Sequence, residues 1–194
     1  MEHPDCQELS DNEIIVQSLR NQDYFACIIH RYQGKLLSYI RRISNVNLQE
    51  AEDILQESFI KAYLNLNDFD TSLKFSSWIY RIVHNQTISN FRRQKARPEG
   101  NLLDVEDKIL NNFAHDLDLH KEMDHKLLKK MIESALRQLP RKYREVIVLR
   151  FFLENSYDEI ADILQKPNGT VATLINRAKK QLQNILKKHV DAPI

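Results

Sequence analysis

The chain has 194 residues, of which 42% are hydrophobic and 28% are charged, and its formal net charge is +1. This composition is typical of a soluble globular protein with one or two small domains. Three glycines and five prolines are too few for a turn-rich β architecture and favour helices. The small net charge excludes a protein that binds nucleic acid through bulk charge alone, so any such surface must be local.

The N-terminus has no signal-peptide pattern, and no apolar run is long enough to span a bilayer. Cys6 and Cys27 match neither zinc nor redox spacing. We therefore expect a cytoplasmic protein without membrane insertion, in which both cysteines are reduced thiols.

Up to residue 66 the chain repeats the apolar period of amphipathic helices. Residues 1–10 are expected to form a loose tail, and residues 21–23 should separate the first two helices. A third helix within residues 47–66 has one apolar face and another that mixes carboxylates and amides with aromatic side chains. Such a face suits a basic partner helix, but most faces of this kind are only solvated.

The most informative stretch is Ser72–Arg97, which contains the only tryptophan of the chain. Its apolar residues recur at three- and four-residue steps, amide and hydroxyl side chains lie between them, and four cations follow at its end. Single-stranded nucleic acid requires such stacking faces, base-edge partners and phosphate-neutralising groups. The competing interpretation is an ordinary core helix with a solvated, charged end.

Residues 98–125 begin with Pro98 and are rich in Asp and Glu, which predicts an acidic, flexible linker. His115, His120 and His125 lie in this segment without metal-ligand spacing, so we expect no metal and no cofactor.

The last part of the chain, residues 126–190, predicts another group of helices. Ser156 and Glu159 form a capping-box pattern at the start of a short helix. A turn at residues 167–169 and a long helix over residues 170–189 should follow. A short helix, a turn and a longer helix make a helix-turn-helix.

Three motifs in this order resemble the extracytoplasmic-function (group 4) sigma factors of bacterial RNA polymerase, which belong to the sigma-70 family. They are AEDILQESFIKAYLNL, FSSWIYRIVHNQTISNFRR and LRQLPRKYREVIVLRFFLENSYDEIADILQKPNGTVATLINRAKKQL. The resemblance implies an all-α fold with two small helical domains. A sigma2-like domain would span residues 11–97, and a sigma4-like helix-turn-helix domain would span residues 126–190, with the acidic linker between them.

The resemblance also implies a role for individual residues. The polymerase clamp coiled coil would be contacted by Asp53, Gln56, Glu57, Phe59 and Tyr63. The −10 element would be bound and melted by Phe75, Ser76, Trp78, Arg81, Asn85, Ser89, Asn90, Arg92 and Arg93. The −35 element would be contacted by Thr170, Thr173, Asn176, Arg177 and Lys180.

Some positions depart from the family pattern. Ala172 and Leu174 stand where the recognition helix usually carries cations, Ser89 replaces an Asp, and Gln165 replaces the glycine of the turn. Two missing cations near phosphate should weaken binding and flatten its salt dependence. We therefore expect weak or altered −35 recognition, compensated by a further DNA-bound partner.

The function that the resemblance implies is that of a sigma factor, which directs RNA polymerase to promoters and assists their opening. Its partners would be the clamp coiled coil and flap of core polymerase, duplex and single-stranded promoter DNA, and an anti-sigma factor. The acidic linker would either thread through the polymerase or act as a plain tether.

Two alternatives from other classes remain. One is a sigma-like adaptor that binds polymerase without opening promoters, and the other is a conventional dimeric helix-turn-helix regulator. No catalytic constellation or phosphate-binding loop is present in the sequence, so the chain is not expected to be an enzyme.

Overall fold

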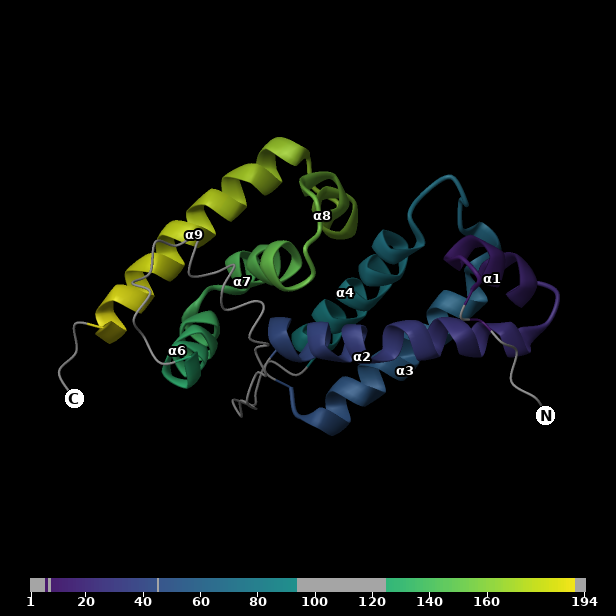
Figure 1. Ribbon diagram of the computed structural model, residues 1–194, viewed down its shortest axis with the longest axis horizontal. Coiled ribbons are helices and arrows are strands. Elements are labelled where there is room, and N and C mark those ends of the chain that lie inside the picture. The colour runs from purple at the N-terminus through teal and green to yellow at the C-terminus, as the bar shows by residue number, and fades with distance from the viewer. Residues whose placement is uncertain (1–5, 7, 45, 94–124, 191–194) are drawn as a thin grey trace. The chain divides into compact units, whose positions relative to one another are not determined.

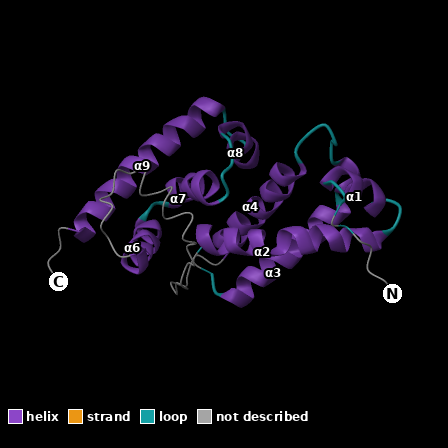
Figure 2. Ribbon diagram, viewed as in Figure 1, coloured by secondary structure: helices purple, strands orange, loops and turns teal. Residues whose placement is uncertain are grey.

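The computed structural model describes residues 6, 8–44, 46–93 and 125–190, and within these ranges every regular element is a helix (Figures 1 and 2). The chain divides into an N-terminal unit that carries α1 to α4 and a C-terminal unit that carries α6, α7, most of α8 and α9. The expected all-α class is therefore confirmed. No helix in the described ranges is long and apolar enough to cross a membrane.

The N-terminal unit is built from helices whose ends are fixed by side-chain caps. In chain order it contains α1 (Asp11–Ser18), η1 (Gln22–Tyr24), α2 (Phe25–Ile43), α3 (Leu48–Leu64), η2 (Leu66–Asp68) and α4 (Phe75–Arg93). Ser10 and Glu13 form a capping box before α1, and Asn47 and Glu50 form another before α3. The expected break near residue 22 is the short turn η1.

The centre of this unit is α3, which packs against both α2 and α4 (Figure 1). Ala51, Ser58 and Ala62 lie on its buried side and are fully covered. Because these side chains are small, the backbones of the neighbouring helices can come close. The hydroxyl of Ser58 donates to the Ile54 carbonyl, so this buried polar group is satisfied within α3. The apolar face predicted for this helix is thus confirmed.

Cys6 and Leu9, in the described part of the segment before α1, are tied to α2, whereas the sequence predicts a loose tail there. The Arg31 guanidinium pairs with Asp11 at 2.6 Å and donates to the carbonyls of Cys6 and Leu9. The prediction of two reduced thiols was wrong, because the structure joins Cys6 to Cys27 of α2 in a disulfide. Sequence spacing could not show this pair, since the chain must fold back on α2 before the two residues meet.

The C-terminal unit contains α6 (His125–Gln138), α7 (Arg141–Ile147), η3 (Val148–Phe152), α8 (Tyr157–Leu164) and α9 (Asn168–Val190). The end of α6 before Pro140 agrees with the sequence pattern. The helix that follows is different, because it changes after Ile147 into the wider π-helical turn η3. The Leu153 amide there donates to the Val148 carbonyl, five residues back. Four of the five side chains of η3 are buried, and the wider turn helps to direct them into one core.

The helix-turn-helix consists of α8, a short turn and α9. Ser156 and Glu159 form the expected capping box at the start of α8. The backbone of the turn adopts a left-handed conformation at Gln165, with φ of 51°, which explains why glycine suits this position. The last helix begins at Asn168, so the turn ends earlier than the sequence predicted.

Glu145 makes the stability of the C-terminal unit depend on pH. Burial raises the pKa of its carboxyl from 4.5 to about 7, and the positive charges of Arg141, Lys166 and Arg144 offset only part of this effect. Because the folded state holds this proton more tightly than the unfolded state, its contribution to stability is complete below pH 4.5 and is lost as the pH rises through 7.

We predict that Glu145→Gln removes this pH dependence, which amounts to at most about 3 kcal/mol between pH 4.5 and 8. The measurement is urea unfolding at both pH values, followed through the NMR amide signals of α7. Glu154→Gln is the matched control, because Glu154 is exposed in the same unit. Equal pH dependence in Glu145→Gln and the unchanged chain would contradict the prediction.

Candidate nucleic-acid interface

The N-terminal unit contains a hollow of about 380 Å³ between α3 and α4. This volume lies within the range of roughly 300–1,000 Å³ that is usual for ligand sites. Residues at the end of α3 and in η2 line one side, namely Lys61, Asn65 and Asp68. Residues of α4 line the other side, namely Trp78, Ile82, Asn85, Gln86 and Ser89. The hollow therefore combines an aromatic face with amide, hydroxyl and charged groups.

Trp78 is held at the wall of the hollow by other aromatic rings. Its ring centroid lies 5.3 Å from that of Phe69 and 5.5 Å from that of Phe75. Phe75 also packs edge-on against Tyr32 of α2. These contacts fix the orientation of the indole and leave Trp78 only 9% exposed. The exposed part of the ring gives the hollow a preformed apolar surface against which a planar group can pack.

A chain of hydrogen bonds runs from the hollow to the outer face of α3. The Lys61 ammonium donates to the side-chain oxygen of Gln86, and the Gln86 amide nitrogen donates to the Glu57 carboxylate. Lys61 and Glu57 are one turn apart on α3, whereas Gln86 belongs to α4 and is only 6% exposed. Gln86 is thus a buried amide held between a cation and an anion. We name this set the 57–86–61 chain.

The structure brings together only part of the set predicted to bind the −10 element. Trp78, Asn85 and Ser89 line the hollow. Phe75 is buried beneath Trp78, so it supports the wall and is not a surface group. Arg92 and Arg93 are exposed in the last turn of α4. The remaining predicted residues, Ser76, Arg81 and Asn90, are half-buried on α4 and do not line the hollow.

The predicted −10 set contains none of Lys61, Asn65, Asp68, Ile82 and Gln86, although Ile82 and Gln86 lie in the Ser72–Arg97 stretch that the sequence singles out. The first three come from α3 and η2, and their distance along the chain from α4 hides the relation. Gln86 carried a usable signal, because a glutamine at an inward position of a helix needs a polar partner.

The outer face of α3 has acidic and amide groups in its middle and apolar groups toward its end. Asp53, Gln56 and Glu57 are exposed, as the sequence predicted. Phe59 is only 7% exposed and packs against Phe25, so it belongs to the core, whereas Tyr63 packs on Phe25 and stays partly exposed. Two large apolar side chains that the predicted set left out are also exposed on this face: Ile60 at 60% and Leu64 at 71%.

In the C-terminal unit, one side of α9 is open to solvent. The five residues predicted for the −35 element are all exposed there: Thr170, Thr173, Asn176, Arg177 and Lys180. Val171, Ile175 and Ala178 face the core. Ala172 and Leu174 are half-buried.

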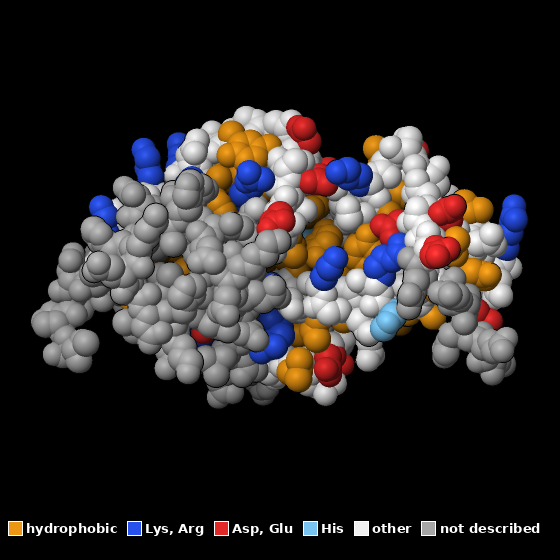
Figure 3. All heavy atoms as spheres, in the orientation of Figure 1, with side chains coloured by type: hydrophobic (Ala, Val, Ile, Leu, Met, Phe, Trp, Pro, Cys, Tyr) orange, Lys and Arg blue, Asp and Glu red, His pale blue; other side chains and the backbone are white. Residues whose placement is uncertain are grey.

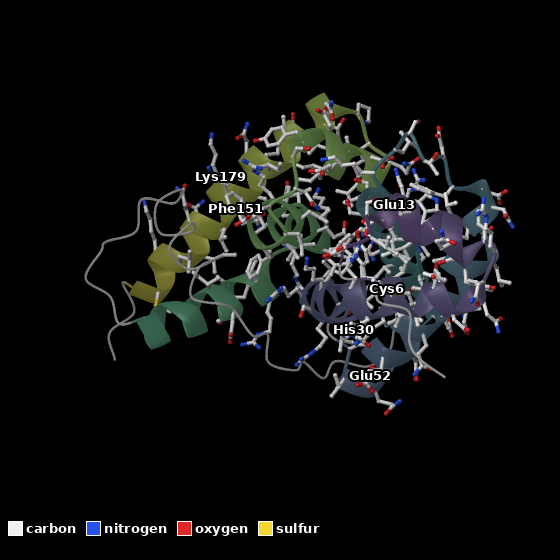
Figure 4. The ribbon with its side chains drawn as sticks, turned by 45° about the vertical axis from the view of Figure 1, so that its right-hand side comes forward. Cys6, Glu13, His30, Glu52, Phe151 and Lys179 are labelled. Atoms are coloured by element: carbon white, nitrogen blue, oxygen red, sulfur yellow. A yellow bond between two sulfur atoms is a disulfide. The ribbon has the colours of Figure 1, made fainter. Side chains whose placement is uncertain are left out.

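The charges of the described surface are local. On the face shown in Figure 3, Lys and Arg side chains stand among Asp and Glu side chains and form no single basic field. Some cations are engaged by aromatic rings, such as Lys179, whose ammonium lies 5.8 Å from the Phe151 ring centroid (Figure 4). Contacts with phosphate therefore depend on individual, positioned cations.

Metal binding finds no support in the described part of the chain, where no three metal-ligating side chains gather. His115 and His120 lie outside the described residues, as does most of the predicted acidic linker.

Two protein-family models match the chain and together cover more than half of it. The model of sigma-70 region 2 matches residues 28–97, and that of sigma-70 region 4 matches residues 129–182. The first match contains α4 and the hollow, and the second contains α8, the turn and most of α9. The two matches define a sigma-70-type transcription factor.

Curated relatives narrow the class. The sigma factor SigW of Bacillus subtilis is 39% identical over 176 residues, covering 86% of this chain and 91% of SigW. The sigma-H factor of Pseudomonas aeruginosa is 33% identical, and the match covers 84% of this chain and 86% of sigma-H. The sigma-E factor of Haemophilus influenzae is 30% identical and covers 92% of this chain and 96% of its own.

Solved structures share the fold. CnrH, solved with the cytosolic domain of CnrY, has a TM-score of 0.66 at 25% identity and covers 94% of this chain and 99% of its own. RpoE of Bartonella quintana, solved with the anti-sigma factor NepR, has a TM-score of 0.64 at 21% identity. The match covers 87% of this chain and 98% of the RpoE chain.

The chain belongs to the extracytoplasmic-function sigma factors of the sigma-70 family. It directs RNA polymerase to promoters at transcription initiation. The family expected from the three motifs is therefore confirmed.

Proposed function

We propose that the hollow between α3 and α4 receives a base that has left the DNA duplex at the −10 element. The observation that carries this assignment is the fixed Trp78 ring beside the exposed Asn85 amide in one hollow. An aromatic face binds the plane of an unstacked base, and an amide can donate and accept along its edge. A base held there cannot pair again, so its capture favours the open promoter.

We predict that Asn85→Ala lowers the yield of open complex by about tenfold, because one base-edge contact contributes about 1–3 kcal/mol. The measurement is run-off transcription and permanganate reactivity with purified core polymerase on a promoter selected from random DNA. Gln33→Ala is the control, since it removes an exposed amide from α2 of the same unit.

Because Asn85 is exposed, its truncation should leave the fold intact. Strand opening by Asn85→Ala at the level of Gln33→Ala would refute this role for the hollow. Specific run-off by the unchanged chain also separates a sigma factor from an adaptor or a conventional regulator, neither of which initiates with core polymerase alone.

We assign polymerase docking to the outer face of α3. Its carboxylates can pair with basic residues of the clamp coiled coil, and Ile60 and Leu64 supply exposed apolar area that a partner can bury. Phe59 would contribute indirectly, because it packs against Phe25 in the core and so holds α3 in position. Exposed apolar residues one turn apart, bordered by charged ones, are typical of a protein interface.

We predict that Leu64→Ser weakens binding to core polymerase by about tenfold or more, because burial of a leucine contributes about 1.5–3 kcal/mol. Fluorescence anisotropy of the labelled chain measures this affinity. Leu73→Ser is the matched control, since Leu73 is 51% exposed in the loop before α4. Equal affinities of the two variants would remove Leu64 from the interface.

We assign −35 recognition to the open side of α9, where Thr170, Thr173 and Asn176 can reach bases while Arg177 and Lys180 meet phosphates. Half-buried Ala172 and Leu174 add no charge to this side. The short supply of cations supports the proposal that upstream binding is weak and that another DNA-bound protein assists it.

We predict that the double substitution Ala172→Arg and Leu174→Arg strengthens binding to the upstream element. The slope of log affinity against log salt concentration should steepen by about 0.9 for each additional phosphate that is neutralised. Filter binding of promoter fragments at several salt concentrations measures both. Asn184→Arg controls for added charge, because Asn184 is exposed further along α9. If the double variant binds no more tightly than the control, the two positions do not limit binding.

The remaining assignments follow from the family. We propose a cytoplasmic, non-enzymatic factor whose polymerase performs the phosphoryl transfer. CnrH was solved with the cytosolic domain of CnrY, and we propose that an anti-sigma factor holds this chain in a similar way. We retain both proposed roles of the acidic linker, threading through the polymerase and tethering.

A further inference from the structure

We propose that Gln86 is a positioning residue that couples polymerase docking to capture of the single strand, through the 57–86–61 chain. This inference rests on the proposed function of the hollow and of the outer face of α3. It adds a physical link between the two, in which Lys61 binds a phosphate of the captured strand and Glu57 controls how strongly it does so.

The contacts of Gln86 join the hollow to the outer face of α3. Lys61 lines the hollow, Glu57 lies on the outer face of α3, and Gln86 touches both. Gln86 is almost fully buried, so its amide cannot turn to water when one partner leaves. Its oxygen is directed at the Lys61 ammonium and its nitrogen at the Glu57 carboxylate. The position of Lys61 in the hollow therefore depends on a residue that Glu57 holds in place.

The opposite charges of Glu57 and Lys61 also link the two surfaces. In the free protein the Glu57 carboxylate compensates the Lys61 ammonium, which lies one turn further along the same helix. A basic polymerase residue that pairs with Glu57 cancels this negative charge. Lys61 then attracts an anionic phosphate more strongly, because a competing charge has been neutralised. Docking should thus raise affinity for the single strand, and the strand should raise affinity for polymerase by the same factor.

The test compares single-strand affinity of the free chain with that of the chain saturated with core polymerase. The probe is a fluorescent, mixed-sequence DNA single strand, which suits a phosphate contact because this contact is independent of sequence. Glu57→Gln keeps an oxygen that can accept from Gln86 but removes the charge. Glu52→Gln is its matched control, because Glu52 lies on the same helix outside the 57–86–61 chain (Figure 4).

We expect Glu57→Gln to bind the probe about three- to tenfold more tightly than the unchanged chain when polymerase is absent. When polymerase is added, the affinity of Glu57→Gln for the probe should increase less than that of the unchanged chain, by the same three- to tenfold factor. Glu52→Gln should retain the full increase. Equal behaviour of Glu57→Gln and Glu52→Gln would overturn the inference.

A second variant tests the positioning role directly. Gln86→Met preserves the length of the side chain and removes both hydrogen bonds, and Gln33→Met makes the same change at an exposed site on α2. We expect Gln86→Met to reduce the slope of log affinity against log salt by about 0.7, which is the value for one phosphate contact on a single strand. Combining it with Lys61→Met should reduce the slope no further. A slope equal to that of Gln33→Met would contradict the role of Gln86.

Different results would contradict the proposed function of the hollow and the coupling through Gln86. If the unchanged chain saturated with polymerase captures no single strand, the proposed function of the hollow is wrong. If it captures the strand and the variants at residues 57 and 86 match their controls, only the coupling is wrong. Should Gln86→Met fail to fold, Glu57→Gln still decides, because residue 57 is exposed.

Discussion

The N-terminal unit depends on a single constraint, which is that α3 must be buried on two sides at once. It packs against α2 and against α4, and small, fully covered side chains at Ala51, Ser58 and Ala62 allow this close approach. The same packing brings polar groups of α3 and α4 within hydrogen-bonding distance. As a consequence, one helix shapes a hollow suited to a nucleic-acid base and also presents a surface suited to a protein partner.

This arrangement explains why the chain can act on DNA with a net charge of only +1. The binding groups that we propose are few and are positioned by neighbours: aromatic rings contact Trp78, and the Gln86 amide accepts from Lys61. Positioned groups lose little entropy on binding, so each contributes more than a mobile surface cation. We propose weak upstream recognition because the half-buried residues Ala172 and Leu174 add no charge to the open side of α9.

Much of the fold could be predicted from the sequence. The helical periods, the capping boxes at Ser10 and Ser156 and the helix-turn-helix follow from local chemistry. The features of the fold that the sequence did not predict depend on tertiary contacts. The Cys6–Cys27 disulfide and the hydrogen bond from Arg31 to the Cys6 carbonyl form only when the chain folds back on α2. The π-helical turn η3 reflects the shape of the core.

The candidate site was predictable to a similar degree. The family motif led to Trp78 and Asn85, which the structure places in one hollow. The resemblance assigns Phe59 and Phe75 to contact sets, whereas the structure buries both, because tertiary neighbours decide whether an aromatic side chain of a helix faces inward. Lys61 and Gln86 are far apart in sequence, and only the packing of α3 on α4 shows that they meet.

The most direct test of the central claim is photo-crosslinking from residue 85 in an open complex formed with core polymerase. A photoreactive amino acid at this position lies at the hollow between α3 and α4. We expect it to label an unpaired base of the −10 element on one strand, and to do so only when polymerase is present and the promoter is melted. Labelling of duplex DNA or of polymerase alone would show that the hollow does not hold an unpaired base.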